Sequence, residues 1–163
     1  MFMKIYNTLS HKEEVFIPWE EGKVSFYTCG PTVYHYAHIG NMRNYIGHDI
    51  LDKTLRFIGF DVTRCMNITD VGHLTSDSDS GDDKMVASAK KEHKSVLDIA
   101  SFYTDAFFKD FDALNCKRPE IVSNATDNIE EYIKIITKLL EDGYAYKAGG
   151  NVYFDTSKLK DYY

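Results

Sequence analysis

The chain has 163 residues, of which 44% are hydrophobic and 27% charged, and its formal net charge at pH 7 is −6. These values are typical of a globular protein and argue against a disordered chain or a generic nucleic-acid-coating protein. No apolar run is long enough to cross a bilayer, and the first residues lack the layout of a signal peptide. Three cysteines, an odd and sparse number, predict free thiols in a reducing cytoplasm rather than a disulfide framework.

A predicted helix lies between two predicted strands in the first part of the chain. Residues 23–29 are rich in β-branched and aromatic side chains and predict a strand. Apolar residues then recur at helical spacing over residues 39–58, and Gly59 ends that pattern. A second strand is expected over residues 60–66. This order predicts a parallel pair with a right-handed crossover, the start of a doubly wound α/β sheet. The stripe expected to be buried on the helix comprises Ile39, Met42, Ile46, Ile50 and Phe57, with Tyr45 and Leu51 beside them.

A polar loop and a second helix are predicted next. Thr75 to Asp83 is an acidic stretch and predicts a mobile loop. Ser95 and Asp98 form a capping-box-like start for a helix that runs to about Leu114. One side of that helix is expected to carry Leu97, Ala100, Tyr103, Phe107 and Phe111.

The last part of the chain predicts a third helix and a hairpin. The helix begins near Asp127 and ends at Gly143, while residues 144–155 alternate around a Gly-rich turn that is typical of a β-hairpin. The helix is expected to bury Ile129, Ile133, Ile136 and Leu140. Two parallel strands do not complete a doubly wound sheet, so either further strands pair in an order that the sequence does not show or the chain is a fragment. We expect a fragment.

The turn after the first strand combines a thiol, a Gly-Pro pair that is typical of turns, and an imidazole. A strand-to-helix turn presents backbone N–H groups and the positive end of a helix dipole, which together suit a phosphate. Cys29 stands at the strand end. A lone cysteine is most often a small buried hydrophobe, and its place at a strand end makes a metal ligand the second interpretation. Zinc would need about three further ligands, for which His35 and His38 are the nearest residues. Cys65 and Cys116 are expected in the core.

Two short polar segments are the other candidates for a site. In His38-Ile39-Gly40-Asn41, the imidazole and the amide can donate to phosphate oxygens and Gly40 leaves room for a nucleotide, although a helix-terminal His without a special role fits as well. Asn67-Ile68-Thr69-Asp70 follows the second predicted strand and should reach the same crevice. Turn formation explains that second segment equally well.

Together these segments resemble the cysteinyl-tRNA synthetase family. The matching residues are Phe26–Tyr34, with its Cys-Gly-Pro-Thr-Val-Tyr run, His38–Asn41, Asn67–Asp70, Lys117–Pro119 and Gly149–Asp155. Their order and spacing fit the family over nearly the whole chain. The resemblance implies a class I aminoacyl-tRNA synthetase with an α/β, Rossmann-type catalytic domain. Residues 1–115 would form the first half of that domain, and residues 116–163 the start of a connective α+β insertion.

The resemblance also implies a reaction and its partners. Such an enzyme joins L-cysteine to ATP with Mg²⁺, releases pyrophosphate and passes the cysteinyl group to tRNA(Cys). Zn²⁺ would take the substrate thiolate directly, because a soft cation prefers sulfur to the hydroxyl of serine. That preference would select cysteine without an editing site.

Roles for individual residues follow from the resemblance alone. The catalytic residues would be His38 and Asn41, and ATP would be bound by Thr32, His38, Gly40 and Asn41. Cys29 would be the metal ligand, and the cysteine substrate would be bound by Cys29 through zinc and by Gly30, Asn67, Thr69 and Asp70, with Thr69 the strongest candidate for a direct contact. Asn41 stands where the family signature has a second His.

The second ATP signature and the other three zinc ligands of the family normally lie beyond residue 163. We therefore expect the isolated chain to be an inactive N-terminal part of such an enzyme. Two alternatives stay open. One is a cysteine-activating ligase that acts on a small amine, and the other is a non-enzymatic module that binds a nucleotide or a partner protein.

Overall fold

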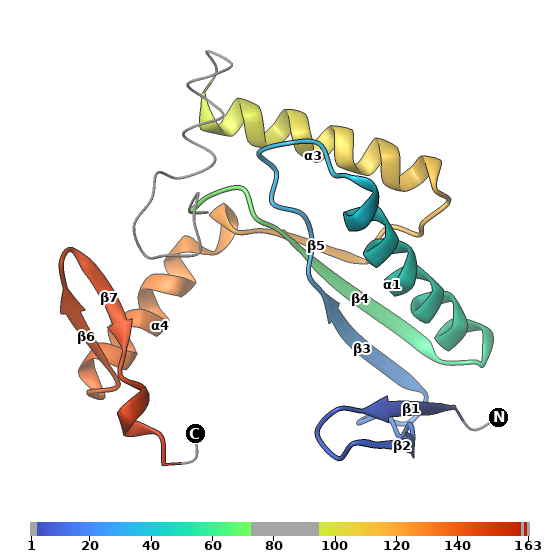
Figure 1. Cartoon of the computed structure of the whole chain (residues 1–163), viewed down its shortest axis with the longest axis horizontal. Coiled ribbons are helices and arrows are strands. Elements are labelled where there is room, and N and C mark those ends of the chain that lie inside the picture. The colour runs from blue at the N-terminus through green and yellow to red at the C-terminus, as the bar shows by residue number, and fades with distance from the viewer. Residues whose placement is uncertain (1–2, 73–94, 161, 163) are drawn as a thin grey trace. The chain divides into compact units, whose positions relative to one another are not determined.

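The computed structural model describes residues 3–72, 95–160 and 162 (Figure 1). The chain divides into two compact units, Met1–Asn124 and Ala125–Tyr163. The expected acidic loop from Thr75 to Asp83 lies outside the described residues. Among the residues that the structure describes, no helix is both long and apolar enough to span a bilayer.

A three-stranded parallel sheet forms the centre of the first unit. Its strands lie in the order β3-β4-β5, with β3 at Lys23–Thr28, β4 at Asp61–Ile68 and β5 at Ile121–Asn124. The expected parallel pairing of the first two strands is confirmed, as is the α/β class. The third strand was not predicted because it has only four residues and follows Pro119 closely. It lies after residue 115, so the sheet includes residues that the sequence assigned to the insertion.

Two helices cover one face of this sheet (Figure 1). They are α1, Ile39–Phe57, and α3, Val96–Ala113. Alternate residues of β4 turn toward the helices, because successive strand side chains point to opposite faces. The core shared by the sheet, the helices and the loop before α1 contains Val33, Met42, Tyr45, Met66, Ile68, Ile99, Ala100, Tyr103, Phe107, Phe108, Phe111 and Cys116.

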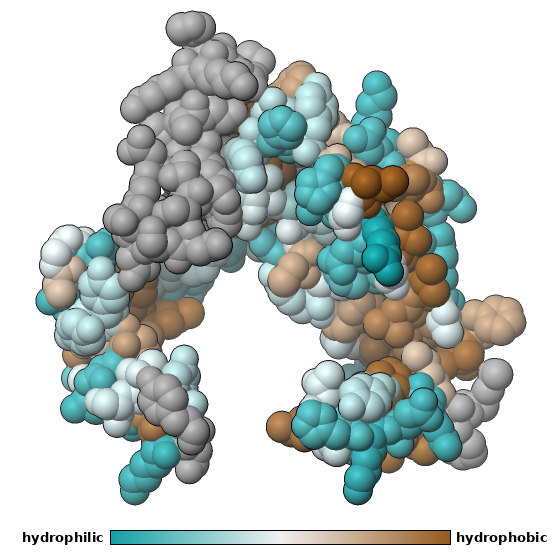
Figure 2. Space-filling model, in the orientation of Figure 1, coloured by the Kyte–Doolittle hydropathy of each residue, from teal (hydrophilic) through white to brown (hydrophobic). Residues whose placement is uncertain are grey.

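A short antiparallel hairpin precedes the sheet. It consists of β1, Lys4–Asn7, and β2, Lys12–Val15, and it was not predicted from the sequence. Hydrophilic residues dominate its surface (Figure 2), since β2 carries Lys12, Glu13 and Glu14. Both strands are exposed, so no alternation of buried and exposed residues marks them in the sequence.

The helix predicted over residues 39–58 is confirmed, but its buried face is not the predicted one. Met42 and Tyr45 are buried as expected, whereas the expected core residues Ile39, Ile50 and Phe57 are exposed. Acidic side chains take part of the face that turns to the protein interior: the buried residues of α1 are Met42, Tyr45, Asp49, Asp52 and Leu55. Buried carboxylates are tolerated here because cationic groups and backbone N–H groups meet them, as described below.

The expected start of α3 is confirmed in detail. Ser95 Oγ accepts a hydrogen bond from Asp98 N at 3.1 Å, which satisfies a backbone donor that the helix itself leaves open. Leu97, which the sequence placed on the same side as Ala100, Tyr103, Phe107 and Phe111, is not buried with them, because its side chain is 66% exposed. Ile99 and Phe108, absent from the predicted stripe, are buried instead.

The second unit contains one helix and one hairpin. The helix is α4, Ile129–Glu141, after a short 3-10 turn (η1, Thr126–Asn128), and the hairpin pairs β6, Ala145–Ala148, with β7, Asn151–Phe154, before a last turn (η2, Thr156–Lys158). Gly149 and Gly150 both have positive φ angles, +56° and +82°, which is typical of the tight turn predicted here. The expected burial of Ile129, Ile133, Ile136 and Leu140 is wrong, because no residue of α4 is buried in the structure. The apolar spacing predicted the helix correctly, but among the described residues of this unit no buried hydrophobic cluster packs against its apolar stripe.

Candidate functional site

A cavity of about 290 Å³ opens where β3 ends and α1 begins. Four of the predicted ATP or substrate residues line it: Gly30, Thr32, His38 and Asn41. Aromatic side chains supply much of the remaining wall, namely Tyr34, His35, Tyr36, Tyr45, Tyr103 and Phe107. The cavity lies beyond the carboxyl end of a parallel strand, the place where open α/β sheets bind ligands.

His38 caps the first turn of α1. Its Nδ1 atom accepts hydrogen bonds from Gly40 N at 3.1 Å and from Asn41 N at 3.4 Å, and Asn41 Oδ1 accepts one from His38 N at 3.1 Å. An accepting Nδ1 carries no proton, so the neutral ring holds its proton on Nε2. Two donors are left for a ligand at this helix end, the Nε2–H group of His38 and the Nδ2 group of Asn41. Both can bind an anion, and the first turn of α1 contains no acidic residue that would repel one.

Gly40 lies directly against the His38 ring. A Cβ atom at this position would stand 2.9 Å from His38 Cε1, too close without a shift of the ring. The sequence suggested that Gly40 leaves room for a nucleotide. In the structure, Gly40 leaves room for the imidazole, which would have to shift to admit a side chain here.

Gly30, just after β3, packs closely against the end of β4. Its backbone N donates to Asn67 Oδ1 at 2.9 Å. An added Cβ would lie 1.7 Å from the backbone oxygen of Asn67 and 2.7 Å from Met66 Cγ. Only glycine fits here, because a backbone oxygen at that distance cannot move aside as a flexible side chain would.

The pairing of these two segments continues beyond the regular strands. Thr32 and Thr69 form an isolated parallel bridge, in which Val33 N donates to Thr69 O at 3.1 Å and Thr69 N donates to Pro31 O at 3.0 Å. Asn67 also donates from Nδ2 to Thr69 Oγ1 at 3.0 Å. The sequence placed Asn67 after the second strand, but it lies within β4, which runs to Ile68.

The other predicted site residues, Cys29, Gly40, Asn67, Thr69 and Asp70, do not line the cavity. Cys29 is an exposed free thiol just past the end of β3. Asp70 is buried and lines a second cavity, of about 230 Å³, with residues of α3 and β5: Leu97, Ala100, Ser101, Thr104, Asp105 and Asn124. The structure therefore brings Gly30, Asn67 and Thr69 together and directs Asp70 elsewhere.

The described residues do not complete a zinc site. Among them there is no group of three or more His, Cys, Asp or Glu side chains that could hold a metal ion. The two nearest predicted ligands are both engaged elsewhere. The ring of His35 stacks on that of Tyr103, with centroids 6.1 Å apart, and His38 uses Nδ1 to cap α1. Cys116 is buried in the core as expected, while Cys65 is only partly buried.

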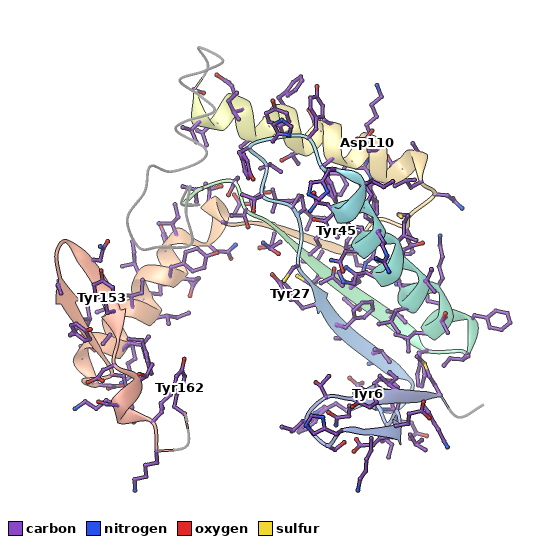
Figure 3. All side chains as sticks on the ribbon, viewed as in Figure 1. Tyr6, Tyr27, Tyr45, Asp110, Tyr153 and Tyr162 are labelled. Carbon is purple, nitrogen blue, oxygen red and sulfur yellow. The ribbon has the colours of Figure 1, made fainter. Side chains whose placement is uncertain are left out.

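Tyr45 is a site residue that the sequence did not single out. It lies on α1 (Figure 3) and lines the cavity. Burial raises the pKa of Tyr45 to about 12, and the nearby Cys29 thiol adds to the effect. The phenol therefore stays protonated and can donate a hydrogen bond. In the sequence, the helical spacing indicated only that Tyr45 belongs to the core. No sequence signal showed that it also lines the cavity.

The chain is similar to known proteins both in sequence and in fold. Residues 15–163 match the family described as tRNA synthetases class I (C) catalytic domain. Curated relatives include the cysteine–tRNA ligases of Treponema denticola, 59% identical over 99% of this chain, and of Zymomonas mobilis, 50% identical over 96% of it. The chain spans 33% and 30% of those two proteins. A solved structure described as an arginyl tRNA synthetase from Campylobacter jejuni has a TM-score of 0.57 over 89% of this chain and 40% of its own, at 11% identity, and it shows the fold alone.

Proposed function

Because this chain belongs to the cysteine branch of the class I tRNA synthetase catalytic-domain family, we propose that it serves the ATP-dependent activation of L-cysteine and its transfer to tRNA(Cys). The observation that carries the proposal is the cavity at the end of β3, where the cap of α1 and the Gly30–Asn67 contact meet. The chain spans about a third of its curated relatives, so the residues described here account for one part of that reaction.

The ATP side of the proposed site is the start of α1. In the activation step a carboxylate oxygen of cysteine attacks the α-phosphorus of ATP, a new P–O bond forms, and pyrophosphate leaves. Negative charge builds on the phosphoryl oxygens, and Mg²⁺ would offset part of it. We assign His38 Nε2–H and Asn41 Nδ2 to donate to these oxygens, with Thr32 and Gly40 beside the nucleotide. Donors that are already fixed by the helix cap need little reorganisation during the reaction.

The cysteine side is formed by the paired segments after β3 and at the end of β4. We place the amino acid near Gly30, Asn67 and Thr69, and Asp70 as a residue that shapes this end of the sheet from its own cavity. Cys29 would contribute one thiolate to a zinc ion, whose softness would favour the substrate sulfur. The described residues supply that single ligand, so no step is derived through the metal.

The second unit would begin the insertion of the catalytic domain, and the tRNA would be bound by the protein as a whole. We place the reaction in the cytoplasm, since all three cysteines are free thiols.

Cysteine-dependent ATP–pyrophosphate exchange by the natural protein that carries this sequence tests the proposal. We expect exchange with cysteine, little with serine, and formation of cysteinyl-tRNA(Cys) when tRNA is added. Exchange without charging of any tRNA would instead support a ligase that uses a small amine. Absence of cysteine-dependent exchange in a folded protein that binds ATP would contradict the proposal.

A substitution at His38 separates the proposed roles. His38→Ala should slow adenylate formation by about 100-fold, the effect of losing one donor to a developing oxyanion. Cysteine binding should weaken far less. Because alanine also removes the helix cap, His38→Asn is the matched control: asparagine caps well but lacks the Nε2–H group. Equal losses in rate and in cysteine binding would argue against a transition-state role.

A further inference from the structure

One side-chain amide, that of Asn67, links the segment that follows β3 to the end of β4. Asn67 Oδ1 accepts from Gly30 N at 2.9 Å and from the Tyr27 hydroxyl at 2.6 Å, while Asn67 Nδ2 donates to Thr69 Oγ1 at 3.0 Å. Tyr27 is the penultimate residue of β3 and lies at the carboxyl end of that strand (Figure 3). We propose that Asn67 and Tyr27 are positioning residues: Asn67 sets the orientation of the Thr69 hydroxyl and of Gly30, and Tyr27 acts on the site through Asn67. This inference rests on the proposed function for its effect on cysteine.

The orientation of the Asn67 amide follows from its neighbours. A backbone N–H can only donate, so the atom that faces Gly30 N must be the amide oxygen. The nitrogen of the amide then faces Thr69 Oγ1. A reversed amide would place its NH₂ group against the Gly30 donor and its oxygen against Thr69.

The hydroxyl of Thr69 is oriented as a result. A hydroxyl has one proton to donate and two lone pairs. Because Thr69 Oγ1 accepts from Asn67, its own proton points to another group. Backbone bonds to Pro31 and Val33 already fix the main chain of Thr69, so the Asn67 contact decides which way its side chain presents that donor.

Tyr27 contributes little to the core. Its side chain is 59% exposed, and it alternates with Thr28, which is buried. Removing the hydroxyl from an exposed ring leaves no cavity, so an effect on cysteine would come from the hydrogen bond to Asn67 rather than from lost packing. Tyr6 on β1 is a matched control, because its side chain is 56% exposed and lies outside the residues of the site.

A double-mutant cycle on the natural protein tests the proposal, with Tyr27→Phe, Asn67→Ala and the combined variant. The loss of one hydrogen bond predicts that Tyr27→Phe raises the KM for cysteine in pyrophosphate exchange roughly three- to tenfold. The KM for ATP should stay within about twofold, as should both KM values of Tyr6→Phe. In the Asn67→Ala background, Tyr27→Phe should have a clearly smaller effect than in the parent, because the side chain through which it acts on Gly30 and Thr69 is gone.

Hydrogen exchange at the Gly30 amide gives a second readout that needs no activity. Asn67→Ala removes the acceptor of Gly30 N, so this amide should exchange roughly tenfold faster than in the parent. Tyr27→Phe should raise the rate less, and less still when Asn67 is already alanine.

Additive effects of the two substitutions on the KM for cysteine would overturn the proposal, because Tyr27 would then act independently of Asn67. Equal increases in the KM for cysteine and for ATP would overturn it as well, since they indicate general loosening. If the parent protein shows no cysteine-dependent exchange, the proposed function fails, and the Gly30 amide alone decides the inference: unchanged protection in Asn67→Ala would reject it.

Discussion

Two polar networks in the first unit differ in the kind of group they join. At the carboxyl ends of β3 and β4, the network is neutral: the Asn67 amide, two backbone segments and the Tyr27 hydroxyl. Between α1, β4 and the segment after α3, the network is ionic. The first lies beside the proposed site, and the second holds helix and strand together.

The ionic network centres on two fully buried groups of opposite charge, Arg64 on β4 and Asp52 on α1. Arg56 Nε donates to Asp52 Oδ1 at 2.7 Å, and Arg64 Nη1 lies 3.9 Å from Asp52 Oδ2. Arg56 Nη2 reaches Glu120 Oε1 at 2.8 Å, and Arg64 N donates to Glu120 Oε2 at 2.9 Å. Arg64 Nη2 also donates to the backbone oxygen of Lys117.

Different chemistry therefore governs the stability of this sheet and the geometry of the proposed site. A buried ion left without its partner is costly, so the ionic network should control whether the unit folds. A neutral amide that is already hydrogen-bonded costs less to alter, so the network at the strand ends should control the shape of the site. Substitutions in each network, ordered by their effect on stability, test this division.

The largest loss of stability is expected from Asp52→Ala. It leaves Arg64 buried without its carboxylate, which predicts a fall in the free energy of unfolding of about 3–5 kcal/mol, measured by urea denaturation. Asp112→Ala is the matched control: it breaks the pair with Arg118, whose side chains are about half exposed, and should cost less than about 1 kcal/mol. Similar losses in the free energy of unfolding of the two variants would contradict the conclusion that a buried ion pair matters more than an exposed one.

Gly30→Ala should combine a moderate loss of stability with a large loss of function. The added Cβ would lie 1.7 Å from Asn67 O, so the two segments must separate. We expect a stability cost of about 1–3 kcal/mol, as for other overpacked sites, and a loss of cysteine-dependent exchange of about 100-fold.

Gly47→Ala is the matched control for this change. Gly47 lies within α1, and a Cβ there meets nothing within 4 Å. Because alanine favours helix over glycine, we expect a gain of up to about 1 kcal/mol and unchanged exchange. Full activity of Gly30→Ala would show that the close contact between Gly30 and Asn67 is not needed for cysteine-dependent exchange.

The smallest expected effect is the pH dependence contributed by Glu120. Burial alone would raise the pKa of Glu120, but hydrogen bonds from Lys117 and from the backbone N–H of Arg64 outweigh it and hold the pKa at about 2. A carboxyl whose pKa is lower in the folded state stabilises the fold above its unfolded value, near 4.5, and this contribution is lost as the pH falls toward 2.

Glu120→Gln should therefore cost about 1 kcal/mol at pH 7, since the side chain is partly exposed, and less at pH 3. Denaturation of parent and variant at the two pH values measures this change. A difference that is the same at pH 3 and pH 7 would contradict the assigned ionic contacts.

The sequence predicted the helices and strands in which apolar residues recur at regular spacing. The strand–helix–strand order over residues 23–66, its parallel pairing and the Gly149-Gly150 turn all follow from local patterns. The buried face of α1 could not be predicted, because part of what accommodates its two acidic residues is distant in the sequence. Asp49 accepts from the backbone N of Lys117 at 2.7 Å, and Asp52 faces Arg64, in addition to the local partners Lys53 and Arg56.

The sequence predicted candidate site residues but not the contacts among them. Sequence motifs pointed to Gly30, Asn67 and Thr69, yet the hydrogen bonds among them depend on the register of β3 against β4. That register also places Tyr27 near Asn67, which no local pattern signals. The α4 helix shows the opposite limit: its strong apolar period predicted the helix correctly and its burial wrongly, because burial depends on a partner surface.

Two serine variants test whether cysteine is selected and activated at the end of β3. Cys29 is exposed beside the site, whereas Cys65 lies within β4 and outside the cavity. In cysteine-dependent pyrophosphate exchange, Cys29→Ser should lower kcat/KM for cysteine by roughly 100-fold or more and reduce the discrimination against serine, while Cys65→Ser should change both by less than about threefold. If Cys29→Ser keeps the parental kcat/KM and discrimination, the claim is contradicted.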